Sequence, residues 1–77
     1  MNPEEFAFVA EVIGKAQLED MGHYQHILLA MAIENAEIDY QRHGDSFLKD
    51  NNFESVEAAS RAYVEACYES IKNGDFE

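Results

Sequence analysis

Residues 23–43, with the sequence HYQHILLAMAIENAEIDYQRH, decide the fold class of this chain. Their apolar side chains recur with the 3.6-residue period of an α-helix and not with the two-residue period of a strand. One buried stripe is expected at Leu29, Ile33, Ala36 and Tyr40. The run Ile27–Ile33 is apolar on every side, so we expect it at the centre of the core. Glu34 and Glu37 are expected on the outer side.

The N-terminal segment predicts another helix, over residues 3–19. Asn2 is a good N-cap, and Pro3 suits the first helical position because its backbone nitrogen has no proton to satisfy. The expected apolar stripe comprises Phe6, Val9, Ile13 and Ala16. Gly14 lies inside this helix, where glycine costs about 1 kcal/mol relative to alanine. It either permits close packing or marks a weak point.

Two connections are expected. A turn at residues 19–22, with Asp20 capping the next helix, is favoured over one uninterrupted helix. After Gly44, a frequent helix stop, residues 45–52 read as a loop. We expect Phe47 and Leu48 in this loop to fold back onto the helices.

The third helix is predicted over residues 53–73 and ends near Gly74. Its expected buried stripe comprises Val56, Ala59, Tyr63, Ala66, Cys67 and Ile71. Its expected outer side carries Glu57, Arg61, Glu65 and Glu69, which recur every four residues. The sequence therefore predicts an all-α fold, a small three-helix bundle that forms a single domain over residues 1–77.

The charge is extreme for so short a chain. Sixteen acidic residues stand against five basic ones in 77 residues, a net charge of −11. Such a protein repels nucleic acid and anionic membranes. A chain of this size buries only about 60% of its unfolded surface, so covering more surface by self-association is favoured. Phe8 and Val12 lie outside the main stripe of the first helix, which predicts a homodimer interface there.

A surface this negative is expected to attract a basic partner. Carboxylates one helical turn apart are spaced by about 6 Å, near the spacing of phosphates along a nucleic acid strand. The first hypothesis is therefore a non-enzymatic inhibitor or decoy that mimics nucleic acid and occupies a basic nucleic-acid-binding protein. The expected contacts are Glu57, Glu65, Glu69 and Tyr68, followed by Glu34 and Glu37. In size and composition the chain is comparable with phage and mobile-element counter-defence proteins, including anti-restriction and anti-CRISPR proteins.

Two other hypotheses remain open at this point. The chain could be a structural or adaptor homo-oligomer whose acidic surface only keeps it in solution. Glu19, His23 and His26 would share one face if residues 19–26 were helical, and these residue types suit a transition metal. This pattern is weaker than known zinc motifs, and we expect neither a metal nor another cofactor.

No catalytic motif is found in the sequence. There is no glycine-rich phosphate loop, and Cys67 lies beside Glu65 and Glu69, which disfavour a reactive thiolate. A single cysteine, no signal-peptide pattern at the N-terminus and no apolar run near the ~20 residues that span a bilayer predict a cytoplasmic protein.

Overall fold

The computed structural model describes residues 1–74 and contains five α-helices joined by short turns. These are α1 (Pro3–Ile13), α2 (Lys15–Glu19), α3 (His23–His43), α4 (Asp45–Asp50) and α5 (Val56–Lys72). No strand occurs in the described residues, which confirms the all-α prediction. The short helix α4 was not expected, and α2 was expected only as the end of one helix over residues 3–19. The predicted domain runs to residue 77, and its last three residues lie outside the described part.

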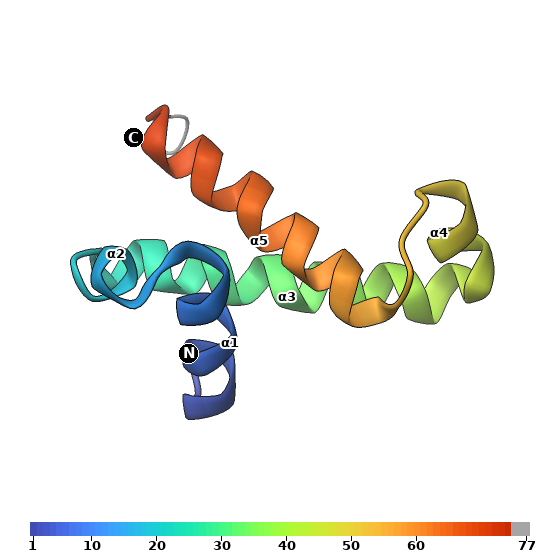
Figure 1. Ribbon diagram of the computed structural model, residues 1–77, viewed down its shortest axis with the longest axis horizontal. Coiled ribbons are helices and arrows are strands. Elements are labelled where there is room, and N and C mark those ends of the chain that lie inside the picture. Colours follow the sequence, from blue (N-terminus) through green and yellow to red (C-terminus); the bar gives the residue numbers. More distant parts are fainter. Residues whose placement is uncertain (75–77) are drawn as a thin grey trace.

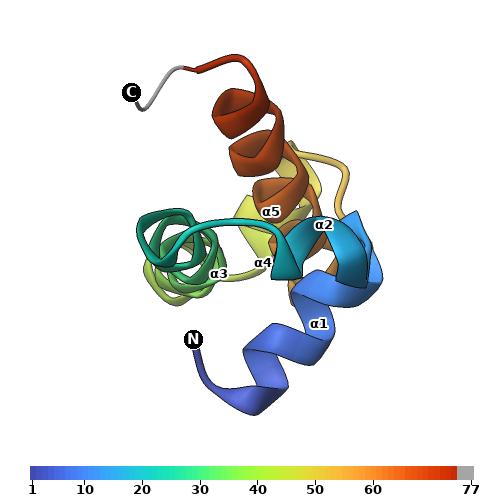
Figure 2. The same ribbon diagram turned by 90° about the vertical axis from the view of Figure 1, so that its left-hand side faces the viewer.

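The helices are arranged in two layers. Figure 1 shows α5 running obliquely across α3, and Figure 2 shows α3 on one side with α1, α2 and α5 on the other. The pair α3 and α5 forms the most extensive helix contact. The molecule measures 36 × 26 × 17 Å between its outermost Cα atoms. Since one helix is about 10 Å thick, the short dimension holds only two layers, and within residues 1–74 no helix packs against one face of α3.

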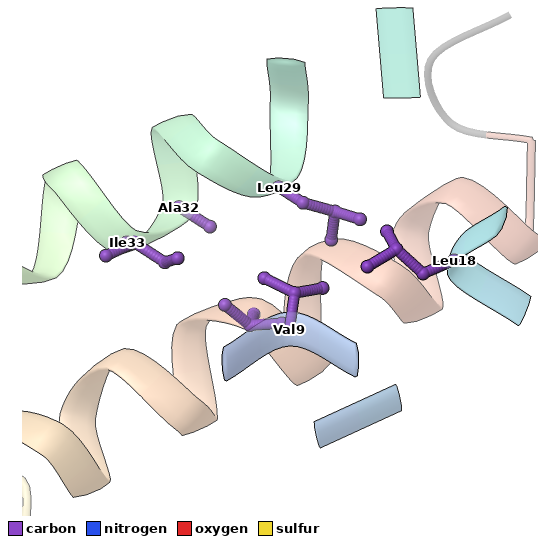
Figure 3. Packing of buried hydrophobic residues seen from close by; sticks show 6 residues of the cluster. Val9, Leu18, Leu29, Ala32 and Ile33 are labelled. Carbon is purple, nitrogen blue, oxygen red and sulfur yellow. The ribbon is translucent and has the colours of Figure 1, made fainter. Parts of the chain in front are cut away.

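The main core lies between these two layers (Figure 3). Its buried members come from four helices and comprise Val9, Leu18, Leu29, Ala32, Ile33 and Val64. The predicted stripe on α3 is confirmed for Leu29, Ile33 and Ala36, while Tyr40 is half-buried. The prediction for Ile27–Ile33 is wrong in part, because Ile27 and Met31 face solvent on the uncovered side of α3.

A second, smaller core seals the other end of α3. It is built from Ala36, Phe47 and Ala59, with Phe53 and Tyr63 packed against it. Phe47 is 7% exposed, so its expected fold-back onto the helices is confirmed. Phe47 lies on the short helix α4, whereas a loop was expected over residues 45–52.

Two positive-φ residues bound α4. Gly44 has φ of 60° after α3, and Asn52 has φ of 59° after α4. The amide of Phe53 then donates to the carbonyl of Leu48 at 2.9 Å, the pattern of a Schellman helix ending. A helix of only six residues therefore lies between two residues with positive φ.

The first predicted helix is interrupted, which corrects the range 3–19. Gly14 has φ of 101°, a conformation outside any helix, and its amide donates to the carbonyl of Ala10 at 2.9 Å. The chain changes direction there, so Leu18 is fully buried and Ala16 is exposed. The capping of α1 by Asn2 is confirmed, because its side chain accepts a hydrogen bond from the amide of Glu5 at 2.8 Å.

The turn expected at residues 19–22 is confirmed, but Asp20 does not cap α3. The N-cap is Gly22, whose amide donates to the side-chain oxygen of Gln25 at 2.8 Å. Helix α5 begins at Val56 and not at residue 53, because the hydroxyl of Ser55 caps it by accepting from the amide of Ala58 at 3.1 Å.

The buried side of α5 is rotated from the predicted one. Ser60 and Val64 are buried, although neither was assigned to the stripe, while Ala66 is exposed. Ala59 is fully buried as predicted. Helix α5 packs against α1 as well as against α3. It therefore needs a second apolar side, and its buried residues differ from the single predicted stripe.

Candidate interaction surface

A hollow rimmed by carboxylates lies where α1, α3 and α5 meet. Its floor is formed by Phe8, Ile33, Val56 and Ser60, and its rim by Glu4, Glu5, Glu37 and Glu57. Its volume is about 270 Å³. We call it the acidic hollow. Of its rim, Glu37 and Glu57 were predicted as contact residues, whereas Glu4 and Glu5 were assigned only to the start of a helix.

A second hollow lies further along the same two helices. It is lined by Val12 and Ile13 of α1 and by Ala62, Glu65, Ala66, Tyr68 and Glu69 of α5. Its volume is about 450 Å³. Three of the predicted contact residues, Glu65, Glu69 and Tyr68, are therefore close together. They are separate from Glu57, and Glu34 lies in neither hollow.

Arg61 lies between the two hollows. Its guanidinium is 3.7 Å from a carboxylate oxygen of Glu11 and lies 6.0 Å from the ring centre of Phe8. Both side chains of the ion pair are well exposed, so the pair contributes little to stability. It nevertheless joins α1 to α5 across the junction.

The glutamates that line these two hollows, or pair with Arg61, lie along the α1–α5 junction and reach α3 at Glu37, and we call this set the acidic seam. It comprises Glu4, Glu5, Glu11, Glu37, Glu57, Glu65 and Glu69. The cations beside it are Arg61 and Lys72, and Lys72 lies 3.3 Å from Glu69. Seven carboxylates against two cations leave a net formal charge of −5 on this surface.

Phe8 and Val12 are not the unused apolar surface that their predicted role in self-association assumed. Both are half-buried and pack against the main core cluster. Phe8 is also part of the acidic hollow, with Arg61 over its ring. The interruption at Gly14 explains the difference, because it turns α1 so that two of its sides face the other helices.

Tyr68 is less available than the sequence suggested. It is half-buried against the main core, and the ammonium of Lys72 lies 5.2 Å from its ring centre. Among residues 1–74, the most exposed large apolar side chain is Tyr24, at 59%. Tyr24 lies near the start of α3, in the layer opposite the acidic seam.

The candidate metal ligands Glu19, His23 and His26 are not brought together. Nε2 of His26 lies 2.7 Å from the carbonyl oxygen of Leu18, and the ring of His26 packs edge-on against Phe6 at 6.3 Å. His26 therefore ties the turn to α3. Within residues 1–74, no three side chains of the metal-binding types are grouped so as to hold an ion.

Cys67 is half-buried on α5. Burial raises the pKa of its thiol, so the thiol holds its proton more firmly than a free cysteine does. Since the thiolate is the reactive form, this environment favours a packing role.

A tyrosine–carboxylate contact joins α3 to α5. The hydroxyl of Tyr63 donates to Oδ2 of Asp39 at 2.6 Å. This hydrogen bond, followed by burial, raises the pKa of Tyr63 to about 12. The Tyr63 ring also meets Phe47 edge-on at 6.1 Å, so the contact positions both helices against the smaller core.

The sequence analysis missed an apolar stripe on the uncovered face of α3, formed by Tyr24, Ile27, Met31 and Ile38. We call it the outer stripe. The sequence does indicate this stripe, because Tyr24, Met31 and Ile38 are spaced by seven residues, or two helical turns, and so lie on the same side of the helix. Two of its members, Ile27 and Met31, were instead expected within the buried run Ile27–Ile33, and Tyr24 and Ile38 were assigned to no stripe.

Comparisons with protein-family models, with curated proteins and with solved structures found no match for this chain. No helix within residues 1–74 has the length and apolar character needed to cross a membrane.

Proposed function

We propose that this protein is a non-catalytic inhibitor or decoy that binds the basic surface of a nucleic-acid-handling protein through its acidic seam. The observation that carries the proposal is the concentration of charge along the α1–α5 junction. Counter-defence against restriction or CRISPR complexes is the setting that its size and charge favour.

The seam has the sign of charge of a nucleic acid strand, at a lower density. Its seven carboxylates lie on α1, α3 and α5. On α5, the three glutamates from Glu57 to Glu69 span twelve residues, or about 18 Å, which is one carboxylate per about 6 Å compared with one phosphate per about 3.4 Å of a DNA strand. The carboxylates of α1 and α3 beside this row strengthen the negative potential that a basic groove would meet.

The acidic hollow has the chemistry to receive a lysine or arginine side chain. Such side chains lay their methylene groups on apolar surface and keep the charged end among polar groups. Here the apolar floor is provided by Phe8, Ile33 and Val56, and the charge by the four glutamates of the rim. This combination gives a shaped contact in addition to long-range attraction.

The test is a competition assay. A tagged form of the protein captures its partner from a host lysate, and labelled DNA or RNA then competes for that partner. The double variant Glu57→Lys with Glu65→Lys should weaken competition severely, because it replaces attraction by repulsion on the seam. Both glutamates are exposed, so the fold should be retained.

The matched control is Asp45→Lys with Asp50→Lys. It changes the net charge by the same amount, but on α4, outside the seam. If the two double variants lose affinity equally, only net charge matters and the seam is not the contact. Full competition by the seam variant excludes the decoy mechanism on this surface.

The alternative role, a structural or adaptor homo-oligomer, is favoured by the outer stripe. If no nucleic-acid-binding partner is captured at any salt concentration, this alternative replaces the decoy proposal.

A further inference from the structure

The outer stripe is unusual because it leaves large apolar side chains in solvent on the longest helix. Their exposed fractions are 59% for Tyr24, 40% for Ile27, 48% for Met31 and 42% for Ile38. Successive helical residues are rotated by 100°, which places this stripe almost opposite the buried line of Leu29. The stripe therefore faces away from the other layer of helices, which Figure 2 shows on one side of α3 only.

The apolar surface continues from the stripe toward α5. Met31 also lines a hollow of about 360 Å³, together with Leu28, Ala32, Asn35, Tyr63, Ala66 and Cys67. Most of these lining residues are apolar. The uncovered face thus combines a ridge of side chains with an adjacent depression, a shape suited to interdigitation with another helix.

The charge on this face is also exceptional. Of the four Asp, Glu and Arg residues between His23 and Arg42, Glu34 and Arg42 lie beside the stripe and cancel, Asp39 is half-buried in its hydrogen bond with Tyr63, and Glu37 lines the acidic hollow. The whole chain has a net charge of −11. This face is therefore where two copies can approach with the least repulsion, since both acidic seams then lie on the far sides.

We propose that a second copy of this chain docks on the outer stripe, with the two α3 helices antiparallel about a twofold axis near Met31. Tyr24 and Ile38 are each seven residues from Met31, so this axis places Tyr24 opposite Ile38 of the second copy. A parallel pair would instead set Glu34 against Glu34 and Arg42 against Arg42. Like charges in contact disfavour that arrangement.

The face is large enough for such an interface. A stable interface buries about 800 Å² on each partner. Helix α3 has 21 residues and is about 31 Å long, and the hollow between Met31 and α5 widens the face beside it. This inference does not depend on the proposed function, because the stripe and the acidic seam are on different faces.

The first test is sedimentation equilibrium of the full chain from low to high micromolar concentration. The parent should be a dimer at the upper end. Met31→Glu places two like charges at the axis and should raise the dimer dissociation constant by about 100-fold. Ala16→Glu, the control, adds the same charge to an exposed residue of α2 and should change the constant by less than about threefold.

The second test examines the register by oxidation to a disulfide. In a Cys67→Ser background, Met31→Cys should give a covalent dimer, because residues on the axis lie within the 7 Å that a disulfide spans. Ile27→Cys, the control, lies off the axis and should cross-link at least tenfold more slowly. Circular dichroism of each variant checks that the helices are retained.

A parent that stays monomeric at high micromolar concentration overturns the proposal. So does a dimer that Met31→Glu leaves intact. Binding of the monomer to neutral lipid vesicles also contradicts it, because lipid would then be the occupant of the stripe.

Discussion

The contact between Tyr63 and Asp39 connects three helices through a single side chain. Its hydroxyl donates to the carboxylate of α3, while its ring packs against Phe47 of α4. The two residues are 24 positions apart, so the hydrogen bond exists only in the folded chain. It is also the group whose proton affinity changes most clearly on folding.

The first prediction concerns alkaline pH. The pKa of Tyr63 is raised from 10.0 to about 12, so the folded protein holds this proton at pH values where the unfolded chain loses it. The resulting stabilisation is fully present below pH 10 and is lost as the pH rises toward 12. The parent should therefore lose more stability over this interval than Tyr63→Phe, as measured by urea unfolding at each pH.

Tyr63→Phe keeps the ring and should cost about 1 kcal/mol at neutral pH, the usual worth of one hydrogen bond. Tyr40→Phe is the control, because its hydroxyl has no hydrogen-bond partner within the described residues. Equal pH dependence in the parent and in Tyr63→Phe contradicts this account of Tyr63.

At the scale of the elements, Gly14 separates α1 from α2 and so determines which side chains reach the core. The break turns the chain so that Leu18 is fully buried. Without this break, one straight helix over residues 3–19 would place Ala16, and not Leu18, against the core.

The second prediction is that Gly14→Ala is destabilising by more than about 1 kcal/mol, since alanine is strained at φ of 101°. An uninterrupted helix predicts the opposite sign, a gain of about 1 kcal/mol. The matched control is Gly22→Ala, because Gly22 has φ of −74° and an added Cβ would meet only Gln25 at an ordinary distance of 3.7 Å. Because Gly22 is also the N-cap of α3, where alanine is less favourable than glycine, this control should cost from a few tenths up to about 1 kcal/mol, less than Gly14→Ala. If Gly14→Ala were more stable than the parent, the helix would not be interrupted at this glycine, and this account would be contradicted.

The helical periods predicted the existence of the three longer helices, because each has a continuous apolar stripe. The ends were predictable where glycine or a capping side chain acts locally, as at Asn2 and Gly44. The break at Gly14 was not, because a glycine inside a helical pattern is compatible with both outcomes.

The site was predicted less completely for a physical reason. Periodicity gives the faces of one helix but not the way two helices are rotated against each other. The exposed positions of Glu57, Glu65 and Glu69 followed from the pattern alone. The meeting of Glu4, Glu5, Glu37 and Glu57 around one hollow depends on how three helices cross, which the pattern does not contain.

At the scale of the whole molecule, the two layers separate two kinds of surface. The acidic seam, with a net formal charge of −5, lies mainly on the layer containing α1 and α5 and includes Glu37 of α3. The outer side of α3 carries apolar side chains, and its two charges cancel. A basic partner and a second copy therefore have different faces available, and one can bind without displacing the other.

The central claim is that the seam, and not the net charge alone, binds basic groups. The direct measurement is nuclear magnetic resonance of the isotopically labelled protein during titration with a short oligo-arginine peptide. We predict chemical-shift changes concentrated around the acidic hollow, at Glu4, Glu37 and Glu57, with small changes at Asp45 and Asp50 of α4. Changes of equal size at all exposed carboxylates, α4 included, would contradict the claim.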